Sequence, residues 1–304
     1  QNTKANRETW SAAVFAHNEE RRILAALAAL VAAADGHALS IQVLANGCND
    51  RTEERVRAYA ASAPEVKLIS ISVADKANAW NRYVHQEAPT ARVHFFTDGD
   101  VRIAPGSLPL LAETLEQSPW LNAVGGAPLS GRDRSGMSRR LAATGSLAGG
   151  LYAYRGSFVE LLRRRAVRIP IGYIGDDWMA ATFAQRLGAA GATQGRGRVA
   201  LVAHAGFRFR SLSPWRAADW KTYLRRWYRY RLRWYQTLLL SDLMRSDGLE
   251  GLPGAMDDVL GSVSSLPRRT SLRNLPMDLL VLHSLRRAAR RRARHPAPSD
   301  HEPF

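Results

Sequence analysis

Four short apolar runs alternate with helical segments in the first hundred residues, and this alternation most constrains the fold. Each run has the length of a strand and ends in polar residues. The runs cover residues 11–16, 40–45, 66–73 and 93–97. Strands that alternate with helices pair in parallel, so we expect an α/β protein. Ligands of such proteins bind at the carboxyl ends of the strands, where all four polar clusters fall.

The fourth run opens into Asp98-Gly99-Asp100. Alternate side chains of an extended chain point the same way, so Asp98 and Asp100 can reach one point in space. Mg²⁺ or Mn²⁺ takes one or two protein carboxylates and leaves its other positions for water and phosphate oxygens. Asp-Gly is also common in solvated turns, and that alternative stays open for this motif alone.

Polar motifs also follow the other three runs in order. They are His17-Asn18-Glu19, the loop from Asn46 to Thr52 and the segment from Asp75 to Asn81, and a further acidic pair, Asp176-Asp177, lies later in the chain. Together with Asp98-Gly99-Asp100 they resemble the nucleotide-sugar domain of family 2 glycosyltransferases. The resemblance covers roughly residues 11–227. It implies the GT-A fold, a mostly parallel sheet flanked by helices, here with a C-terminal helical and basic appendage.

The resemblance also implies a reaction and the residues that perform it. The enzyme would be inverting and would use a nucleotide-diphosphate sugar, with UDP-sugars favoured, and Mn²⁺ or Mg²⁺. Asn46 stands where an acidic residue is usual, and its amide could still bond a base or ribose. The implied donor-binding residues are His17, Asn18, Glu19, Asn46, Asp50, Lys76, Asn81 and Asp98.

A carboxylate must accept the proton of the attacking hydroxyl, and Asp176-Asp177 supplies two candidates. A helix is expected to begin beside them, which would stabilise their charge. We assign capping or orientation to Asp176 and the base to Asp177. In the metal site we place Asp98 and Asp100, and as a further ligand His204, although a lone histidine is more often structural.

The acceptor side is expected around Gly149, Gly150, Tyr152, Trp178, Arg226 and Trp227. Gly149-Gly150 resembles a family segment where small residues let the acceptor approach, and a Gly-permitted bend is the alternative. Only the Arg-Trp half of the Gln-x-x-Arg-Trp motif of polymer synthases is present, as Arg226-Trp227. This argues for the transfer of one sugar rather than for polymer synthesis. We separately expect the acceptor to be a lipid, a lipid-linked molecule or a glycan.

The formal net charge of +16 is concentrated late in the chain. An aromatic stripe at helical spacing, interleaved with arginines, is formed by Trp220, Tyr223, Trp227, Tyr230 and Trp234. Six further arginines lie within residues 286–294. Such a surface suits an anionic membrane. Packing on the catalytic domain and contact with nucleic acid are the alternatives, and nucleic acid is the less favoured.

We expect an N-terminal arm at residues 1–10, a nucleotide-sugar half at 11–105 and an acceptor half at 106–214. A helical appendage at 215–294, with a loop near 247–273, and a disordered tail at 295–304 would follow. The only cysteine, Cys48, cannot form an internal disulfide, which suits the cytoplasm. The longest apolar run is too short to span a bilayer. We therefore expect a peripheral protein on the inner membrane face, of undetermined oligomeric state.

Two other classes of protein stay open. A nucleotidyltransferase would share the strand-loop plan, but the loop after residue 16 has no glycine to cradle a triphosphate. A basic nucleic-acid-binding protein would explain the arginines but not the ordered carboxylates.

Overall fold

The computed structural model describes residues 10–187, 197–210, 212, 215–262 and 271–294. The chain divides into two compact units. The first comprises Gln1–Ile169 and Asp176–Ser211, and the second comprises Pro170–Gly175 and Leu212–Phe304.

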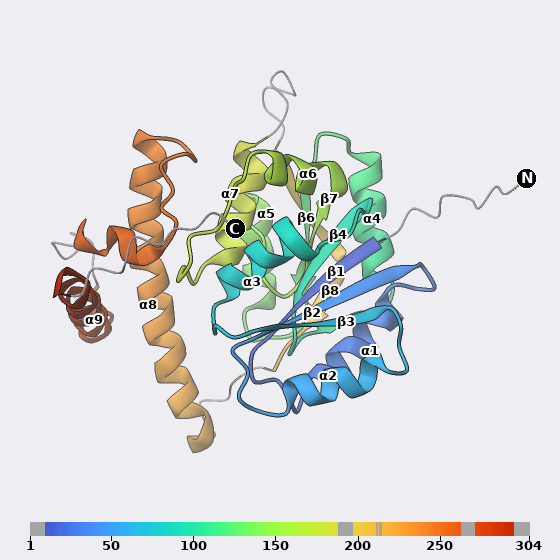
Figure 1. Cartoon of the computed structure of the whole chain (residues 1–304), viewed down its shortest axis with the longest axis horizontal. Coiled ribbons are helices and arrows are strands. Elements are labelled where there is room, and N and C mark those ends of the chain that lie inside the picture. The colour runs from blue at the N-terminus through green and yellow to red at the C-terminus, as the bar shows by residue number, and fades with distance from the viewer. Residues whose placement is uncertain (1–9, 188–196, 211, 213–214, 263–270, 295–304) are drawn as a thin grey trace, which may run out of the picture. The chain divides into compact units, whose positions relative to one another are not determined.

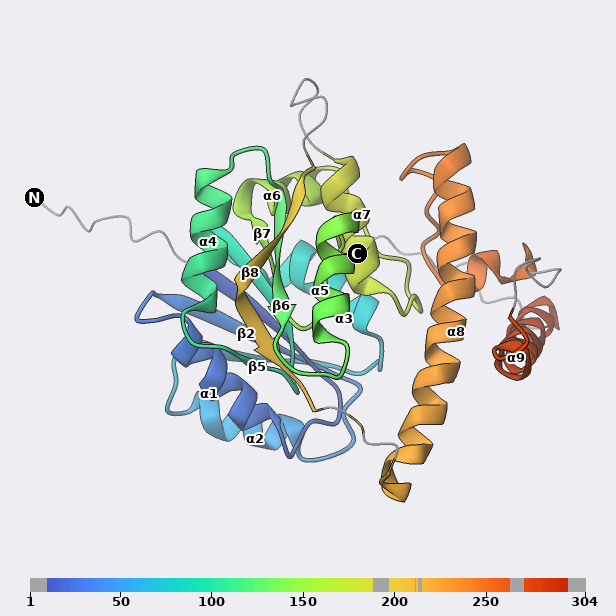
Figure 2. The same cartoon turned by 180° about the vertical axis from the view of Figure 1, so that it is seen from behind.

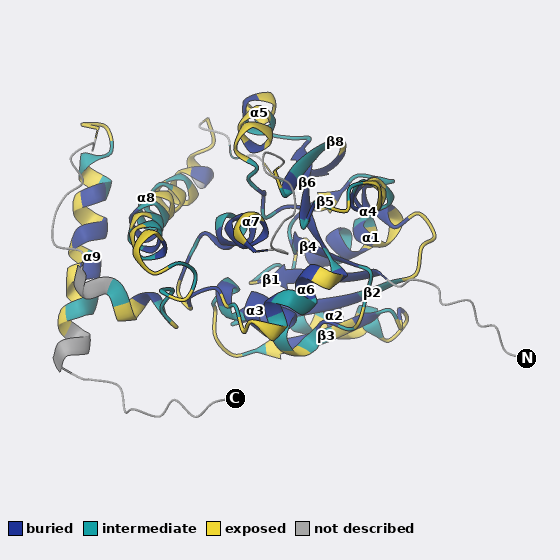
Figure 3. Ribbon diagram, turned by 90° about the horizontal axis from the view of Figure 1, so that it is seen from above, coloured by how far each residue is buried: buried dark blue, intermediate teal, exposed yellow. Residues whose placement is uncertain are grey.

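A mixed sheet of eight strands in the order β3-β2-β1-β4-β7-β6-β8-β5 forms the centre of the first unit. Strands β1, β2, β3 and β4 are parallel to one another, and β6 is parallel to β8, whereas β7 and β5 run antiparallel to the strands beside them. The central strands are buried along most of their length (Figure 3). The strands are β1 (Trp10–Ala16), β2 (Leu39–Asn46), β3 (Val66–Ile71), β4 (Val93–Asp98), β5 (Arg102–Ile103), β6 (Ala123–Pro128), β7 (Tyr152–Arg155) and β8 (Val199–Arg208).

Helices cover both faces of this sheet. Helices α3 and α6 lie in front of it in Figure 1, and α1 and α4 lie in front of it in the reverse view of Figure 2. The helices of the first unit are α1 (Ile23–Ala33), α2 (Thr52–Ala60), α3 (Lys76–Arg82), the π-helix η1 (Tyr83–Glu87), α4 (Ser107–Gln117), α5 (Arg134–Thr144), α6 (Gly156–Arg164) and α7 (Asp176–Arg186).

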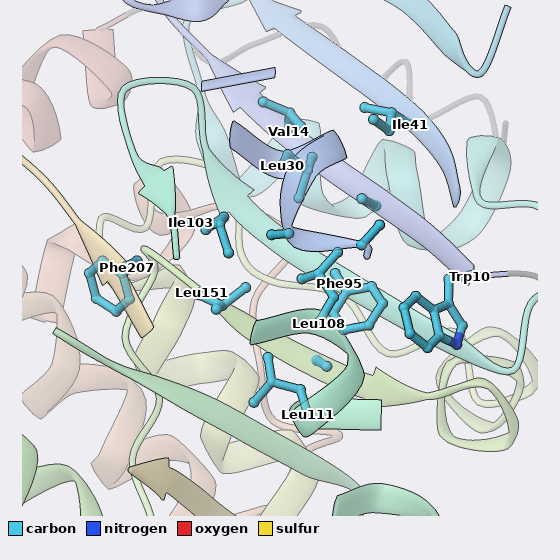
Figure 4. Close-up of a cluster of buried hydrophobic side chains, with 14 of the residues drawn as sticks. Trp10, Val14, Leu30, Ile41, Phe95, Ile103, Leu108, Leu111, Leu151 and Phe207 are labelled. Carbon is cyan, nitrogen blue, oxygen red and sulfur yellow. The ribbon is translucent and has the colours of Figure 1, made fainter. Parts of the chain in front are cut away.

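Two adjacent phenylalanines of β4 show how the strand serves both faces, because successive side chains of a strand point in opposite directions. Phe95 packs into an aliphatic core with Leu30 of α1 and Leu108 of α4 (Figure 4). Phe96 stacks on Tyr152 at 4.6 Å between ring centroids and lies 6.2 Å from Trp80 of α3. One face of the sheet is thus mainly aliphatic, and the other is aromatic.

The second unit consists of helices. They are α8 (Ala217–Ser246), the 3₁₀ helix η2 (Met256–Ser262) and α9 (Leu275–Arg294). Helix α9 packs against α8 through a small core formed by Tyr235, Val281, Leu282 and Leu285. Inside this helix pair the carboxylate of Asp278, which is fully buried, binds the guanidinium of Arg231.

The predicted α/β fold with a helical appendage is confirmed. The expected loop at 247–273 proves to contain η2. The division of the chain also gives Pro170–Gly175 to the helical unit, which the sequence did not predict. The proposed donor and acceptor halves stay a prediction, and the expected tail lies outside the described residues. No described helix is both long and apolar enough to cross a membrane.

Candidate functional site

The loops that follow β1 and β2 are bonded to each other. His17 Nδ1 lies 2.7 Å from the carbonyl oxygen of Asn46, and the Asn49 amide donates to Asn18 Oδ1 at 2.9 Å. The Glu20 amide donates to Asp50 Oδ2 at 3.1 Å. The structure thus brings together the donor residues that the sequence predicted on these two loops.

Backbone geometry holds the same loops in place. Asn18 has a φ of +56°, a left-handed conformation that asparagine tolerates. Gly47 also has a φ of +56°, and a Cβ there would lie 2.5 Å from the amide nitrogen of Ala74. No other residue could occupy position 47 without moving the segment that leads into α3.

The centre of the candidate site is the ammonium group of Lys76, which begins α3. Its Nζ lies 2.6 Å from Asp98 Oδ1 and 2.9 Å from Asp176 Oδ2. Burial disfavours the charge of Lys76, but Asp176 and Asp98 outweigh it and raise its pKa. The side chains of Lys76 and Asp98 remain 28% and 34% exposed, so this cluster is open to a ligand. Asp176 thus pairs with Lys76, and its expected capping or orienting role stays a prediction.

A second cation, Arg22, holds the other carboxylate of the Asp-Gly-Asp motif. Arg22 Nη1 lies 3.3 Å from Asp100 Oδ2, and its Nε lies 2.9 Å from Glu19 Oε2. Burial raises the pKa of Glu19 to about 7, and Asp100 adds to this whereas Arg22 opposes it. Burial likewise raises the pKa of Asp98 to about 6. The site therefore carries more carboxylates than its own cations satisfy.

Gly149 lies between the Lys76 cluster and the candidate base. A Cβ at Gly149 would lie 3.2 Å from Lys76 Nζ, 3.5 Å from Asp98 Oδ2 and 3.9 Å from the Cβ of Asp177. The missing side chain thus leaves space that borders both groups. Asp177 Oδ1 accepts a hydrogen bond from the amide of Trp178 at 2.8 Å.

Two further residues expected on the acceptor side belong to the packing beneath this space. Gly150 faces Phe207, whose ring would lie 2.3 Å from a Cβ added at Gly150. The Gly150 carbonyl accepts a hydrogen bond from Thr97 Oγ1 at 2.8 Å. Tyr152 is buried, and its hydroxyl accepts from Trp80 Nε1 at 2.9 Å. An acceptor could reach Tyr152 only if this aromatic core moved.

Asn81 is buried, with both ends of its amide bonded to Ile169 at 2.8 and 2.9 Å. Direct contact with the donor would require these bonds to break. His204 is exposed, in a bulge where β8 shifts register against Gly126 and Ala127. Its metal role stays a prediction.

Arg226 and Trp227 lie on α8 in the second unit. Arg226 is exposed, and the Trp227 indole donates to Asn274 Oδ1 at 3.2 Å. Their role on the acceptor side also stays a prediction.

The carboxylate ligands fit a divalent ion only if the substrate supplies further ligands and completes its coordination shell. Within the described part of the chain, no three His, Cys, Asp or Glu side chains gather to hold a metal. Asp98 and Asp100 can offer two carboxylate ligands, and Mg²⁺ or Mn²⁺ commonly takes its remaining ligands from phosphate and water. The excess of carboxylates around Asp98 favours such an ion.

Arg22 was not identified from the sequence. Arg22 lies three residues after Glu19, the spacing of an ion pair on a helical turn, and that pattern could have identified it. Its contact with Asp100 spans 78 positions of the chain and leaves no local signal.

The family model described as glycosyl transferase family 2 matches residues 11–175, more than half of the chain. The protein therefore belongs to glycosyl transferase family 2 and is a glycosyltransferase. No curated protein sequence matches it significantly.

Solved structures show the same GT-A fold at low sequence identity. A mannosyltransferase from Pyrobaculum calidifontis, in complex with GDP-Man and Mn²⁺, is 18% identical, with a TM-score of 0.57 over 95% of this chain and 88% of that one. TarS from S. aureus, in complex with UDP-GlcNAc, is 14% identical, with a TM-score of 0.55 over 92% and 81%. Glucosyl-3-phosphoglycerate synthase from Mycobacterium tuberculosis, with Mn²⁺, UDP and phosphoglyceric acid, is 22% identical, with a TM-score of 0.52 over 76% and 78%.

Proposed function

We propose that this protein is an inverting, metal-dependent glycosyltransferase that moves one sugar from a nucleotide diphosphate to a hydroxyl group. The observation that carries the proposal is the cluster in which Lys76 joins Asp98 to Asp176, with the vacant side-chain position of Gly149 beside Asp177. Cationic, metal-binding and proton-accepting groups then border one space at the carboxyl end of β4.

The residues divide the reaction between them. A divalent ion held by Asp98 and Asp100 would neutralise the charge of the departing diphosphate. Lys76 supplies a second positive charge within reach of the same phosphates. Asp177 accepts the proton of the attacking hydroxyl, and Asp176, paired with Lys76, orients the start of α7. A single in-line displacement of this kind inverts the anomeric centre and needs no covalent intermediate on the enzyme.

The solved structures support a nucleotide-sugar donor and a divalent ion, because they hold GDP-Man, UDP or UDP-GlcNAc and, in two cases, Mn²⁺. They differ in the nucleotide, so both series enter the test. A screen of UDP- and GDP-sugars with Mn²⁺ or Mg²⁺, read as released nucleoside diphosphate, should identify one favoured donor. Release that persists in excess chelator, or no release from any donor, would contradict the proposal.

We further propose a lipid or lipid-linked acceptor and a peripheral location on the cytoplasmic face of the membrane. Supporting this, α9 exposes Leu279 and Leu280 close to a row of arginines. A groove of about 570 Å³ runs along this helix. It is lined by Pro276, Leu279, Leu280, Leu282, His283, Arg286, Arg287 and Arg290. Apolar and cationic side chains together suit an anionic amphiphile.

The aromatic stripe of α8 supports the same proposal only in part. Trp220 and Tyr230 are exposed, whereas Trp234 is half-buried and packs on the guanidinium of Arg231, 4.3 Å from its ring centroid. Of these three aromatic residues, only Trp220 and Tyr230 are therefore available to contact a membrane surface. The stronger argument for a membrane is α9.

A further inference from the structure

The segment that leads into the candidate base is built into the helical unit. Pro170–Gly175 clusters with α8, η2 and α9, although the next residue, Asp176, belongs to the first unit. The chain therefore passes between the units at the bond between Gly175 and Asp176. Asp176 and Asp177 are the first two residues of α7. One peptide bond therefore joins this segment to the residues that carry both carboxylates.

One buried carboxamide on α8 holds the segment at two points. Gln236 Nε2 donates to the carbonyl oxygen of Gly172 at 2.8 Å, and the Ile174 amide donates to Gln236 Oε1 at 3.1 Å. The Gln236 side chain is 4% exposed, so water cannot readily replace these partners. Gly172 has a φ of +82°, so the backbone held by Gln236 turns through a conformation that favours glycine.

Neighbouring contacts fix the rest of the segment. The hydroxyls of Tyr173 and Thr237 share a hydrogen bond of 2.8 Å. Both backbone groups of Ile171 form hydrogen bonds. Its amide donates to the carbonyl oxygen of Gly254 at 3.0 Å, and its carbonyl accepts from the Met256 amide at 2.8 Å. At Gly175, a Cβ would lie 2.4 Å from the Tyr173 hydroxyl. Residues 171–174 are thus held by α8 or by the residues at the start of η2, and the packing at Gly175 leaves no room for a side chain.

We infer that Gln236 is a positioning residue for the transfer reaction. By fixing Gly172 and Ile174 it sets where the chain enters α7, and hence where the Asp177 carboxylate meets the acceptor hydroxyl. The inference rests on the proposed function, because the placement of Asp177 matters only if Asp177 accepts a proton. A displacement of about 1 Å at a reacting group can reduce the rate by about 10²-fold.

Two replacements separate the hydrogen bonds. Gln236→Leu removes both at similar volume, whereas Gln236→Glu keeps the acceptor for the Ile174 amide and loses the donor to Gly172. We expect kcat to fall by about 10- to 100-fold in Gln236→Leu and by less in Gln236→Glu. The dissociation constant of the nucleoside diphosphate with Mn²⁺ should not change, because Gln236 is not among the donor residues.

Gln185→Leu is the control, at an exposed glutamine. Gln185 also donates to two backbone carbonyls, those of Thr144 at 3.1 Å and Gly145 at 2.7 Å, and it lies near the far end of α7. Both of these partners lie at the end of α5 rather than in residues 170–175, so its replacement should leave kcat unchanged. A loss of donor affinity as large as the loss of kcat in Gln236→Leu would indicate general disruption and would overturn the positioning role.

Hydrogen exchange tests the contact without reference to catalysis. The Ile174 amide should exchange faster in Gln236→Leu than in the wild type or in Gln185→Leu, because its acceptor is gone. Unchanged exchange overturns the clamp, and faster exchange with unchanged kcat overturns its role in catalysis. If the wild-type protein transfers no sugar, the proposed function and the catalytic role fail together, whereas the exchange rates still decide whether Gln236 holds the segment.

Discussion

The two units each contain a cation paired with carboxylate, and the two sites differ in how far they are closed. In the sheet unit, Lys76 bridges Asp98 and Asp176, and the Lys76 and Asp98 side chains remain about one third exposed. In the helical unit, Arg231 binds Asp278, which is fully buried, and stacks on Trp234. An open ion pair can exchange a partner for a ligand, whereas a closed one mainly fixes the packing around it. The first should therefore govern activity and the second stability.

The largest expected effect is on the open cluster. Asp100→Ala or Asp98→Asn should abolish transfer, a loss of about 10⁴-fold or more, because each removes one of two charges that would face the metal and the departing diphosphate. Thermal unfolding should change little. Initial rates with a chelator-buffered Mn²⁺ series, together with melting curves, test this. Full activity of Asp100→Ala would refute the metal assignment.

Asp177→Asn comes next in size. The amide keeps the shape of the side chain but cannot accept the proton, so kcat should fall by roughly 10²–10⁴-fold while donor binding persists. Single-turnover kinetics and calorimetry with the nucleoside diphosphate separate the two quantities. Should Asp176→Asn be inactive and Asp177→Asn active, the roles of the two residues are reversed.

These first two predictions rest on residues that the sequence alone could find. Asp98 and Asp100 follow an apolar run and alternate along an extended chain, so a local pattern predicts that they converge. The contacts that complete the site have no such pattern. Arg22 reaches Asp100 across 78 positions, and Gln236 reaches Ile174 across 62. Only the packed fold shows which distant polar groups meet, and so Gln236 could not be predicted.

The closed pair should act on stability. Asp278→Asn leaves the Arg231 guanidinium, whose side chain is only 14% exposed, without its counter-charge, which should cost about 3 kcal/mol in the free energy of unfolding of the helical unit. Denaturant unfolding followed by circular dichroism and tryptophan fluorescence measures this. Asp133→Asn breaks an exposed pair with Arg140 and is the control, with little expected change. Equal effects in the two variants would remove the distinction between open and closed pairs.

A buried histidine of the sheet unit, His94, should make the folding stability depend on pH. Burial lowers the pKa of His94 to about 4, from an ordinary value of 6.5, and its Nδ1 lies 3.0 Å from the Tyr83 hydroxyl. Between these values the unfolded chain binds more protons, so stability is complete above pH 6.5 and falls as the pH drops toward 4. The full loss is about 3 kcal/mol.

Denaturant unfolding of wild-type protein and His94→Gln across pH 4–7 tests this contribution. The variant should have a flatter pH profile, because glutamine carries no titrating group. Parallel profiles for the two proteins would show that other groups cause the acid sensitivity. Activity at fixed folded fraction should be unaffected by the substitution, as expected for a closed position.

The smallest effect per residue is expected at the exposed arginines of α9, which can contact a ligand as the partly exposed Lys76 cluster can. Each basic residue near an anionic bilayer contributes about 1 kcal/mol, so Arg287→Gln or Arg290→Gln should weaken liposome binding about fivefold. Binding should require anionic lipid and fade between low and high salt, because the attraction is screened within a Debye length.

The matched controls are Arg134→Gln and Arg139→Gln, exposed arginines of the sheet unit with the same change in charge. Equal losses in both sets would mean that net charge alone attracts the protein. No sedimentation with anionic vesicles at low salt would refute the membrane proposal and favour a soluble acceptor.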